Sequence, residues 1–219
     1  MNFSFLSKYY NYFLEGTGIT IVLALCAVIL GTILGLLLSL LRRSRFKILS
    51  LLAKIYVEFV RGTPILVQIY IIYIGLPKLI GTDLPDITVG AIALSLNSGA
   101  YISEIIRAGI DAVDKGQMEA ARSLGMNQRL AMFEVVIPQA FKNILPALGN
   151  EFISVIKESS MVSVIGVAEL MYKAGIVRGN TALGLEPILV AAGIYFVLTF
   201  ILTRGLSYVE RRLKTSDIR

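Results

Sequence analysis

Histidine is absent from the 219-residue sequence, cysteine occurs once, at Cys26, and charged residues make up only 16%. A lone cysteine excludes an internal disulfide, and the absence of histidine excludes a zinc finger, a histidine-based catalytic triad and a histidine-ligated metal. By contrast, 56% of the residues are hydrophobic, and soluble domains carry about a quarter charged residues. The composition therefore predicts an integral membrane protein.

Five apolar stretches are long enough for transmembrane helices, which need about 20 residues each. The first has no charged residue from Gly16 to Leu41 and is too long for the core of a signal peptide. The tyrosine-rich segment 3–13 before it is typical of a helix at the membrane interface. We predict one all-α transmembrane domain over residues 1–219, with spans at about 16–41, 55–80, 87–110, 143–172 and 186–206.

Basic residues cluster after alternate predicted spans. Lysine and arginine are enriched in cytoplasmic loops, and fifteen of them follow the first, third or fifth span, whereas the opposite loops hold only four. We therefore expect the N-terminus outside and the C-terminus inside, and we attribute the net charge of +6 to membrane edges and not to nucleic acid binding. The fifteen are Arg42, Arg43, Arg45, Lys47, Lys54, Arg107, Lys115, Arg122, Arg129, Lys142, Arg204, Arg211, Arg212, Lys214 and Arg219.

The longest predicted cytoplasmic loop, residues 111–141, has the pattern of a helix. Ala121, Arg122 and Gly125 recur at helical spacing, and Pro138 is expected to end the helical run. Small residues on one helix face let a partner approach closely. An ordinary amphipathic connector that packs on its own chain would show the same pattern.

This loop resembles the EAA loop of bacterial ABC importer permeases. Glu119-Ala120-Ala121, three residues, Gly125, nine residues and Val135-Val136-Ile137-Pro138 keep the spacing of the family pattern E-A-A, three residues, G, nine residues, I-x-L-P. The departures are Val135 for isoleucine and Ile137 for leucine. The chain also resembles the polar amino acid (histidine/glutamine/arginine) branch of these permeases in segments 58–64, 96–101, 157–160 and 164–167.

The resemblance implies a type I ABC importer permease fold in a bacterial cytoplasmic (inner) membrane. In such systems the EAA loop forms a coupling helix that docks on a separate ATPase subunit. The sequence has no G-x-x-x-x-G-K-[ST] phosphate loop, so ATP and magnesium would bind the partner ATPase and this chain would do no bond chemistry. Further partners would be a second permease copy or a related permease, and an external amino-acid-binding protein. The coupling residues implied are Glu119, Ala120, Ala121, Arg122, Gly125 and Pro138.

Two acidic residues of the fourth predicted span are candidates for substrate binding. Glu151 and Glu158 lie seven residues apart, so they share one helix face, whereas Lys157 points about 100° away from Glu158. A carboxylate inside a span is unfavourable unless it is paired or faces a cavity. We expect Glu151 and Glu158 to bind the ammonium or guanidinium group of an amino acid.

The third predicted span contains a polar segment near its middle. Asn97, Ser98 and Gly99 are poor helix formers together, and a helix break there would free backbone N–H groups to bind the substrate carboxylate. Tyr101 could line the same pocket. Alternatively, Asn97 and Ser98 only form hydrogen bonds between helices.

Other intramembrane motifs have structural interpretations. Glu58 with Arg61, and Glu104 with Arg107, have the i,i+3 spacing of ion pairs. The G-x-x-x-G motif at 31–35 allows close helix packing, either within the chain or in a dimer. An ion-coupled secondary transporter that uses Glu151 and Glu158 is the alternative function, and a non-transport scaffold is a more remote one.

Overall fold

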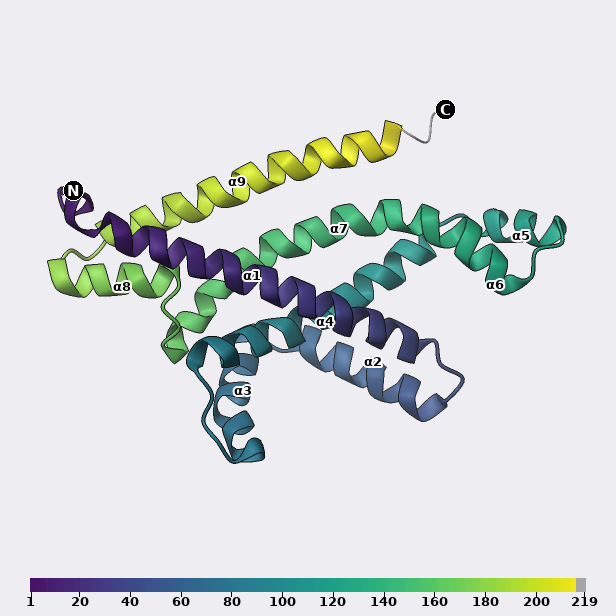
Figure 1. Ribbon diagram of the computed structural model, residues 1–219, viewed down its shortest axis with the longest axis horizontal. Coiled ribbons are helices and arrows are strands. Elements are labelled where there is room, and N and C mark those ends of the chain that lie inside the picture. The colour runs from purple at the N-terminus through teal and green to yellow at the C-terminus, as the bar shows by residue number, and fades with distance from the viewer. Residues whose placement is uncertain (216–219) are drawn as a thin grey trace.

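The computed structural model describes the backbone of residues 1–215 and the side chains of residues 1–213. Arg219 and the last residues of the predicted domain therefore lie outside the described residues, as does the side chain of Lys214. The described part is helical throughout, as the sequence predicts (Figure 1). Its α-helices are α1 (Leu6–Arg42), α2 (Lys47–Gly62), α3 (Ile65–Ile80), α4 (Asp86–Asp111), α5 (Lys115–Ser123), α6 (Gln128–Ala131), α7 (Ile137–Glu158), α8 (Leu170–Thr181) and α9 (Glu186–Thr215).

Helix α1 packs along α4 over much of its length. The contact depends on glycine, because a Cβ at Gly31 would lie 3.0 Å from Ser98 Cβ and one at Gly35 would lie 2.8 Å from Ile102 Cγ2. In the same contact, the Leu34 side chain of α1 occupies the space where Gly99 of α4 has no side chain. The G-x-x-x-G motif therefore serves packing within the chain.

Two of the N-terminal aromatic residues, Phe5 and Phe13, belong to the packed bundle. They are buried against α8, beside Leu170 and Ala174, whereas Tyr10 is 53% exposed. Helix α1 starts at Leu6 and continues without a break into the first predicted span, so the aromatic segment is not a helix of its own. The position of the rings at the depth of the lipid headgroups stays a prediction.

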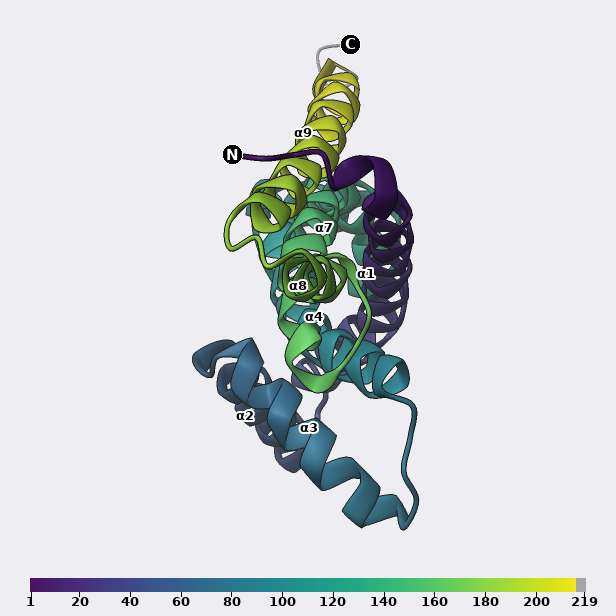
Figure 2. The ribbon, with the colours of Figure 1, turned by 90° about the vertical axis from the view of Figure 1, so that its left-hand side faces the viewer.

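The second predicted span, 55–80, is two helices that meet at an angle of 115°. Pro64 lacks a backbone N–H and disfavours the helical conformation of the residue before it, and Thr63 is accordingly extended. Gln68 Nε2 donates to Val60 O at 2.7 Å and lies 3.0 Å from Thr63 O, so its amide satisfies carbonyls at the end of α2. Both helices lie at one side of the bundle (Figure 2).

The fourth predicted span, 143–172, is also bent. A 3-10 segment, Ser159–Ile165, follows α7 and ends at Gly166, whose φ is +93°, and α8 leaves at 51° to the preceding helix. At the other end, a π-helical turn, Met132–Val136, joins α6 to α7, so the helix continues through Pro138. The helix end predicted at Pro138 is therefore wrong: proline is tolerated in the first turn of α7, where the wider π turn removes the need for its N–H.

Three helices, α1, α4 and α9, are long and apolar enough to cross a membrane, and the number rises to five if each bent pair is one span. The largest buried cluster joins α1, α4, α7 and the 3-10 segment through residues such as Leu23, Leu94 and Ile156. Apolar side chains of α9, including Phe196 and Ile201, face outward. A surface of this kind is suited to lipid or to another membrane-embedded chain.

Candidate functional site

Glu151 and Ser98, predicted to share a site, are in direct contact. Ser98 on α4 is fully buried, and its Oγ donates to Glu151 Oε1 on α7 at 2.8 Å. Glu151 is half-buried and forms no ion pair within residues 1–213. The serine hydroxyl therefore holds one carboxylate oxygen in place and leaves the other without a hydrogen-bond partner within the described residues.

Asn97 and Gly99 have packing roles in the structure. Asn97 is 3% exposed, and its Nδ2 donates to Gln68 Oε1 on α3 at 2.9 Å. Helix α4 runs unbroken through this segment, so the helix break predicted at residues 97–99 is wrong. Hydrogen bonds to α3 and α7 satisfy Asn97 and Ser98 without any change in the backbone, as the alternative interpretation expected.

Glu158 and Tyr101 do not join the Glu151–Ser98 pair by hydrogen bonds. Glu158 is half-buried at the end of α7, and its carboxylate accepts no hydrogen bond from the described residues, while its neighbour Lys157 is exposed. Tyr101 faces the α2 side: the Arg61 guanidinium carbon lies 5.7 Å from the centre of its ring. Within the described residues, the interaction found for the Tyr101 ring is therefore with α2.

Glu104 links the ends of α1, α2 and α4. It accepts a hydrogen bond from Arg42 and a second from Arg107 Nη2 at 2.8 Å, and Arg61 Nη1 lies 3.6 Å from the same carboxylate. The predicted Glu104–Arg107 ion pair is confirmed. The predicted pair of Glu58 with Arg61 is wrong, because Arg61 turns toward Glu104 and Glu58 is exposed.

Glu169 is a buried acidic residue that the sequence analysis missed. Its side chain is fully buried, Tyr195 Oη donates to Oε2 at 2.6 Å, and the backbone N–H of Tyr172 donates to Oε1 at 2.8 Å. Thr20 on α1 lies 3.5 Å from the same carboxylate. The sequence could have indicated this residue, because Glu169 lies inside the fourth predicted span and an ionisable residue there needs polar partners.

The EAA-type loop forms a short helix and a glycine turn. Asp114 caps α5 by accepting the Gly116 N–H at 2.7 Å, and the helix ends at Ser123. Gly125 has φ +89°, and its N–H donates to Arg122 O at 3.0 Å, so a tight turn follows the end of α5. Of the implied coupling residues, Ala121 is buried, whereas Glu119, Ala120, Arg122, Gly125 and Pro138 are exposed.

The loop lies at one end of the molecule. The connection between α1 and α2, the helices α5 and α6, and the end of α9 all lie toward this end, whereas the N-terminus and α8 lie at the other (Figure 1). The segments that follow the first, third and fifth predicted spans are therefore on the same side.

Known proteins resemble the chain over nearly its whole length. Residues 27–215 match the family described as binding-protein-dependent transport system inner membrane component. The arginine transport system permease protein ArtQ of Bacillus subtilis (strain 168) is 46% identical over 206 residues, which cover 94% of each chain. The probable glutamine ABC transporter permease protein GlnM of the same organism is 38% identical over 216 residues, covering 99% of this chain and 100% of GlnM.

Solved structures agree with this assignment. A chain from the crystal structure of an amino acid ABC transporter with histidines matches with a TM-score of 0.92 at 50% identity, covering 97% of this chain and 100% of that one. A chain of the inward-facing MetNI methionine ABC transporter has a TM-score of 0.78 at 16% identity, with 97% and 99% covered, and shows the shared fold alone. The resemblance drawn from the sequence is confirmed: the chain belongs to the binding-protein-dependent transport system inner membrane components, as a permease of the amino acid ABC importer type.

Proposed function

We propose that this chain translocates basic L-amino acids, with the Glu151 carboxylate as the group that binds the cationic part of the substrate. The observation that supports the proposal is the Glu151–Ser98 pair, a half-buried carboxylate with one hydrogen bond and no protein cation. Such a carboxylate inside a span needs a positive partner, and a guanidinium or ammonium group supplies one. The names of the arginine relative and of the histidine-containing structure point the same way.

The membrane arrangement forms a second part of the proposal. We propose five spans, with the N-terminus outside and the C-terminus inside a bacterial cytoplasmic membrane, and each bent helix pair counts as one span. The basic residues of the α1–α2 connection and of the EAA-type loop lie toward one end of the molecule, which supports a cytoplasmic position for that end (Figure 1).

The partners complete the proposed transporter. Two copies of the chain, or one copy and a related permease, would enclose the pathway, and the exposed α5 helix would dock on a separate ATPase that binds ATP and magnesium. An external binding protein would deliver the amino acid to the outer loops. The relatives are ABC permeases and give no support to the ion-coupled alternative.

The test is uptake by the permease–ATPase complex in proteoliposomes supplied with its binding protein. Glu151→Gln keeps the size of the side chain and removes its charge, so uptake of arginine and lysine should fall about tenfold or more, since hydrogen bonds to charged groups contribute roughly 1.5–3 kcal/mol. Glu58→Gln, which removes an exposed carboxylate on α2, should retain uptake. Unchanged uptake of every amino acid by Glu151→Gln would remove Glu151 from the site.

A further inference from the structure

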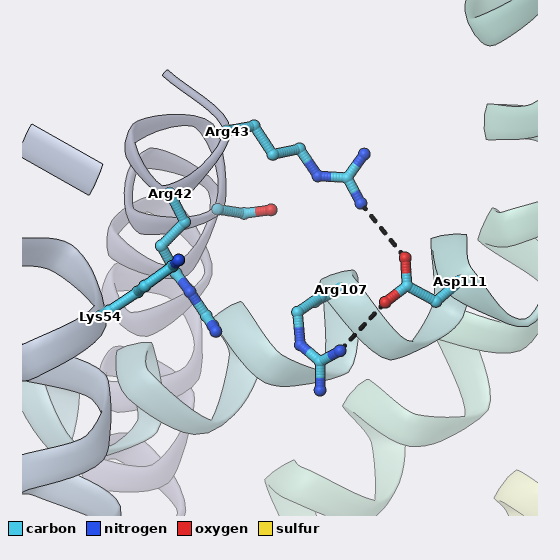
Figure 3. A pocket seen from close by; sticks show the side chains of 6 residues that line it. Arg42, Arg43, Lys54, Arg107 and Asp111 are labelled. Carbon is cyan, nitrogen blue, oxygen red and sulfur yellow. Dashed lines mark hydrogen bonds and ion pairs between the residues drawn. The ribbon is translucent and has the colours of Figure 1, made fainter. Parts of the chain in front are cut away.

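A small basic pocket lies at the end of the molecule that carries the EAA-type loop. It has a volume of about 200 Å³, and its walls come from α1, the start of α2 and the end of α4. Figure 3 shows Arg43 and Arg107 both directed at Asp111. The lining residues are Ser39, Arg42, Arg43, Lys54, Arg107 and Asp111. Pockets for drug-sized ligands have about 300–1,000 Å³, so this one suits a single small group.

Positive charge exceeds negative charge in this pocket. Arg42 and Arg107 pair with Glu104, and Arg107 Nη1 also lies 3.0 Å from Asp111. Arg43 Nη2 is 3.7 Å from Asp111, an exposed and long contact. Lys54 makes no ion pair or hydrogen bond within residues 1–213. Four basic groups therefore face two acidic ones, and the pocket is suited to an anion.

A serine hydroxyl group also lines the pocket. Ser39 is 7% exposed, and its hydroxyl makes no hydrogen bond within the described residues. Ser103 Oγ is the fully buried unpartnered side-chain atom of the described residues, so the Ser39 hydroxyl is open to the pocket. It can donate a hydrogen bond to a ligand oxygen there, which is an observation independent of the charge.

The helices that line the pocket also carry exposed apolar side chains. Leu40, next to Ser39 on α1, is 68% exposed, and Leu51 and Ile55 on α2 are 58% and 53% exposed. A neighbouring hollow lined by Leu51, Ser50 and Lys54 shares Lys54 with the pocket. This combination fits a molecule with an anionic head and long apolar chains, whereas a free anion would make no use of the leucine and isoleucine side chains.

We propose that this pocket binds the phosphate of an anionic phospholipid of the cytoplasmic leaflet, with its acyl chains on the exposed apolar faces of α1 and α2. Basic pockets between transmembrane helices on the cytoplasmic side hold lipid phosphate in this way. The proposal depends on the proposed orientation for the choice of leaflet but does not depend on the transported substrate.

The experiment is lipid titration of the delipidated permease–ATPase complex, followed by native mass spectrometry. Wild type should retain phosphatidylglycerol in preference to phosphatidylcholine with the same chains. Arg43→Gln combined with Lys54→Gln should weaken phosphatidylglycerol binding about tenfold or more, because each basic residue near an anionic lipid contributes on the order of a few-fold to tenfold in affinity. Ser39→Ala should weaken it by a smaller factor without a change in charge.

The matched control is Arg45→Gln combined with Arg204→Gln, which removes two exposed charges that follow the first and fifth predicted spans and lie outside both the pocket and the neighbouring hollow. This control should retain the lipid, and an unchanged elution volume of each variant will show that it folds. Equal loss of phosphatidylglycerol in both double variants would contradict the assignment of lipid binding to this pocket. Displacement of the lipid by millimolar inorganic phosphate would show that the pocket binds free anions and would contradict the assignment to a phospholipid. Loss of the ATPase from Arg43→Gln/Lys54→Gln, with lipid binding intact, would assign the pocket to an acidic protein side chain.

Discussion

Individual buried polar residues hold together the half of the bundle that carries the N-terminus, and Glu169 is the clearest case. Its carboxylate joins α8 to α9 through Tyr195 and lies close to Thr20 of α1. Glu169→Ala should lower the Tm of the detergent-purified protein by about 2 to 10 °C, because it leaves the Tyr195 hydroxyl and the Tyr172 N–H without acceptors. Glu169→Gln, which keeps one acceptor oxygen, should have a smaller effect. Equal Tm values for wild type and Glu169→Ala would show that these hydrogen bonds add nothing to stability.

At the scale of single residues, the cost of an unpaired charge was the most useful rule. It selected Glu151 as a candidate, and the structure shows a hydrogen bond from Ser98 to this carboxylate. The same rule, applied to Glu169, would have found the second buried carboxylate. Reasoning from helix propensity failed at Asn97, because a hydrogen bond to Gln68 on another helix outweighs the local preference of a few tenths of a kcal/mol.

Close packing of α1 on α4 is the main contact between elements, and it makes a prediction about glycine. Gly35→Leu should lower the Tm by several degrees, because its Cβ would lie 3.0 Å from Gly99 O, a backbone atom that cannot move cheaply. Gly18→Leu on the same helix is the control, since no atom lies within 4 Å of its Cβ. If both variants melt like wild type, the tight contact does not limit stability.

The element boundaries show what composition alone cannot predict. Apolar content identified α4 nearly in full and the apolar parts of α1 and α9, because each is one long helix, but it missed the first turns of α1 and the last turns of α9. The same criterion predicted one span where the structure has the pair α2 and α3, and one where it has α7 and α8. Hydropathy measures how apolar a segment is and gives no information about bends between helices. Pro64 was visible in the sequence as a helix breaker. The 115° angle and the hydrogen bonds of Gln68 to the carbonyl groups at the end of α2 are visible only in the tertiary structure.

At the scale of the whole molecule, the exposed tip of the EAA-type loop makes a prediction about assembly. Gly125 has φ +89° and no neighbouring atom within 4 Å of a Cβ, so a substitution there strains the backbone without a clash. Gly125→Arg should reduce co-purification of the ATPase several-fold, whereas Gly125→Asn, which tolerates positive φ, should retain most of it. Equal recovery of the ATPase with both variants would show that the turn is not required for docking.

One continuous helix begins at Gln128, passes through the π turn and ends at Glu158. It therefore contains the second part of the EAA-type loop, residues 128–141, and also Glu151. At 1.5 Å per residue, about 35 Å separate Gln128 from Glu151 along its axis. A rotation of the whole helix about its axis would turn the loop end and Glu151 together and would change the direction of the carboxylate. Binding of a partner at the proposed docking loop could in this way change the orientation of the candidate substrate-binding group.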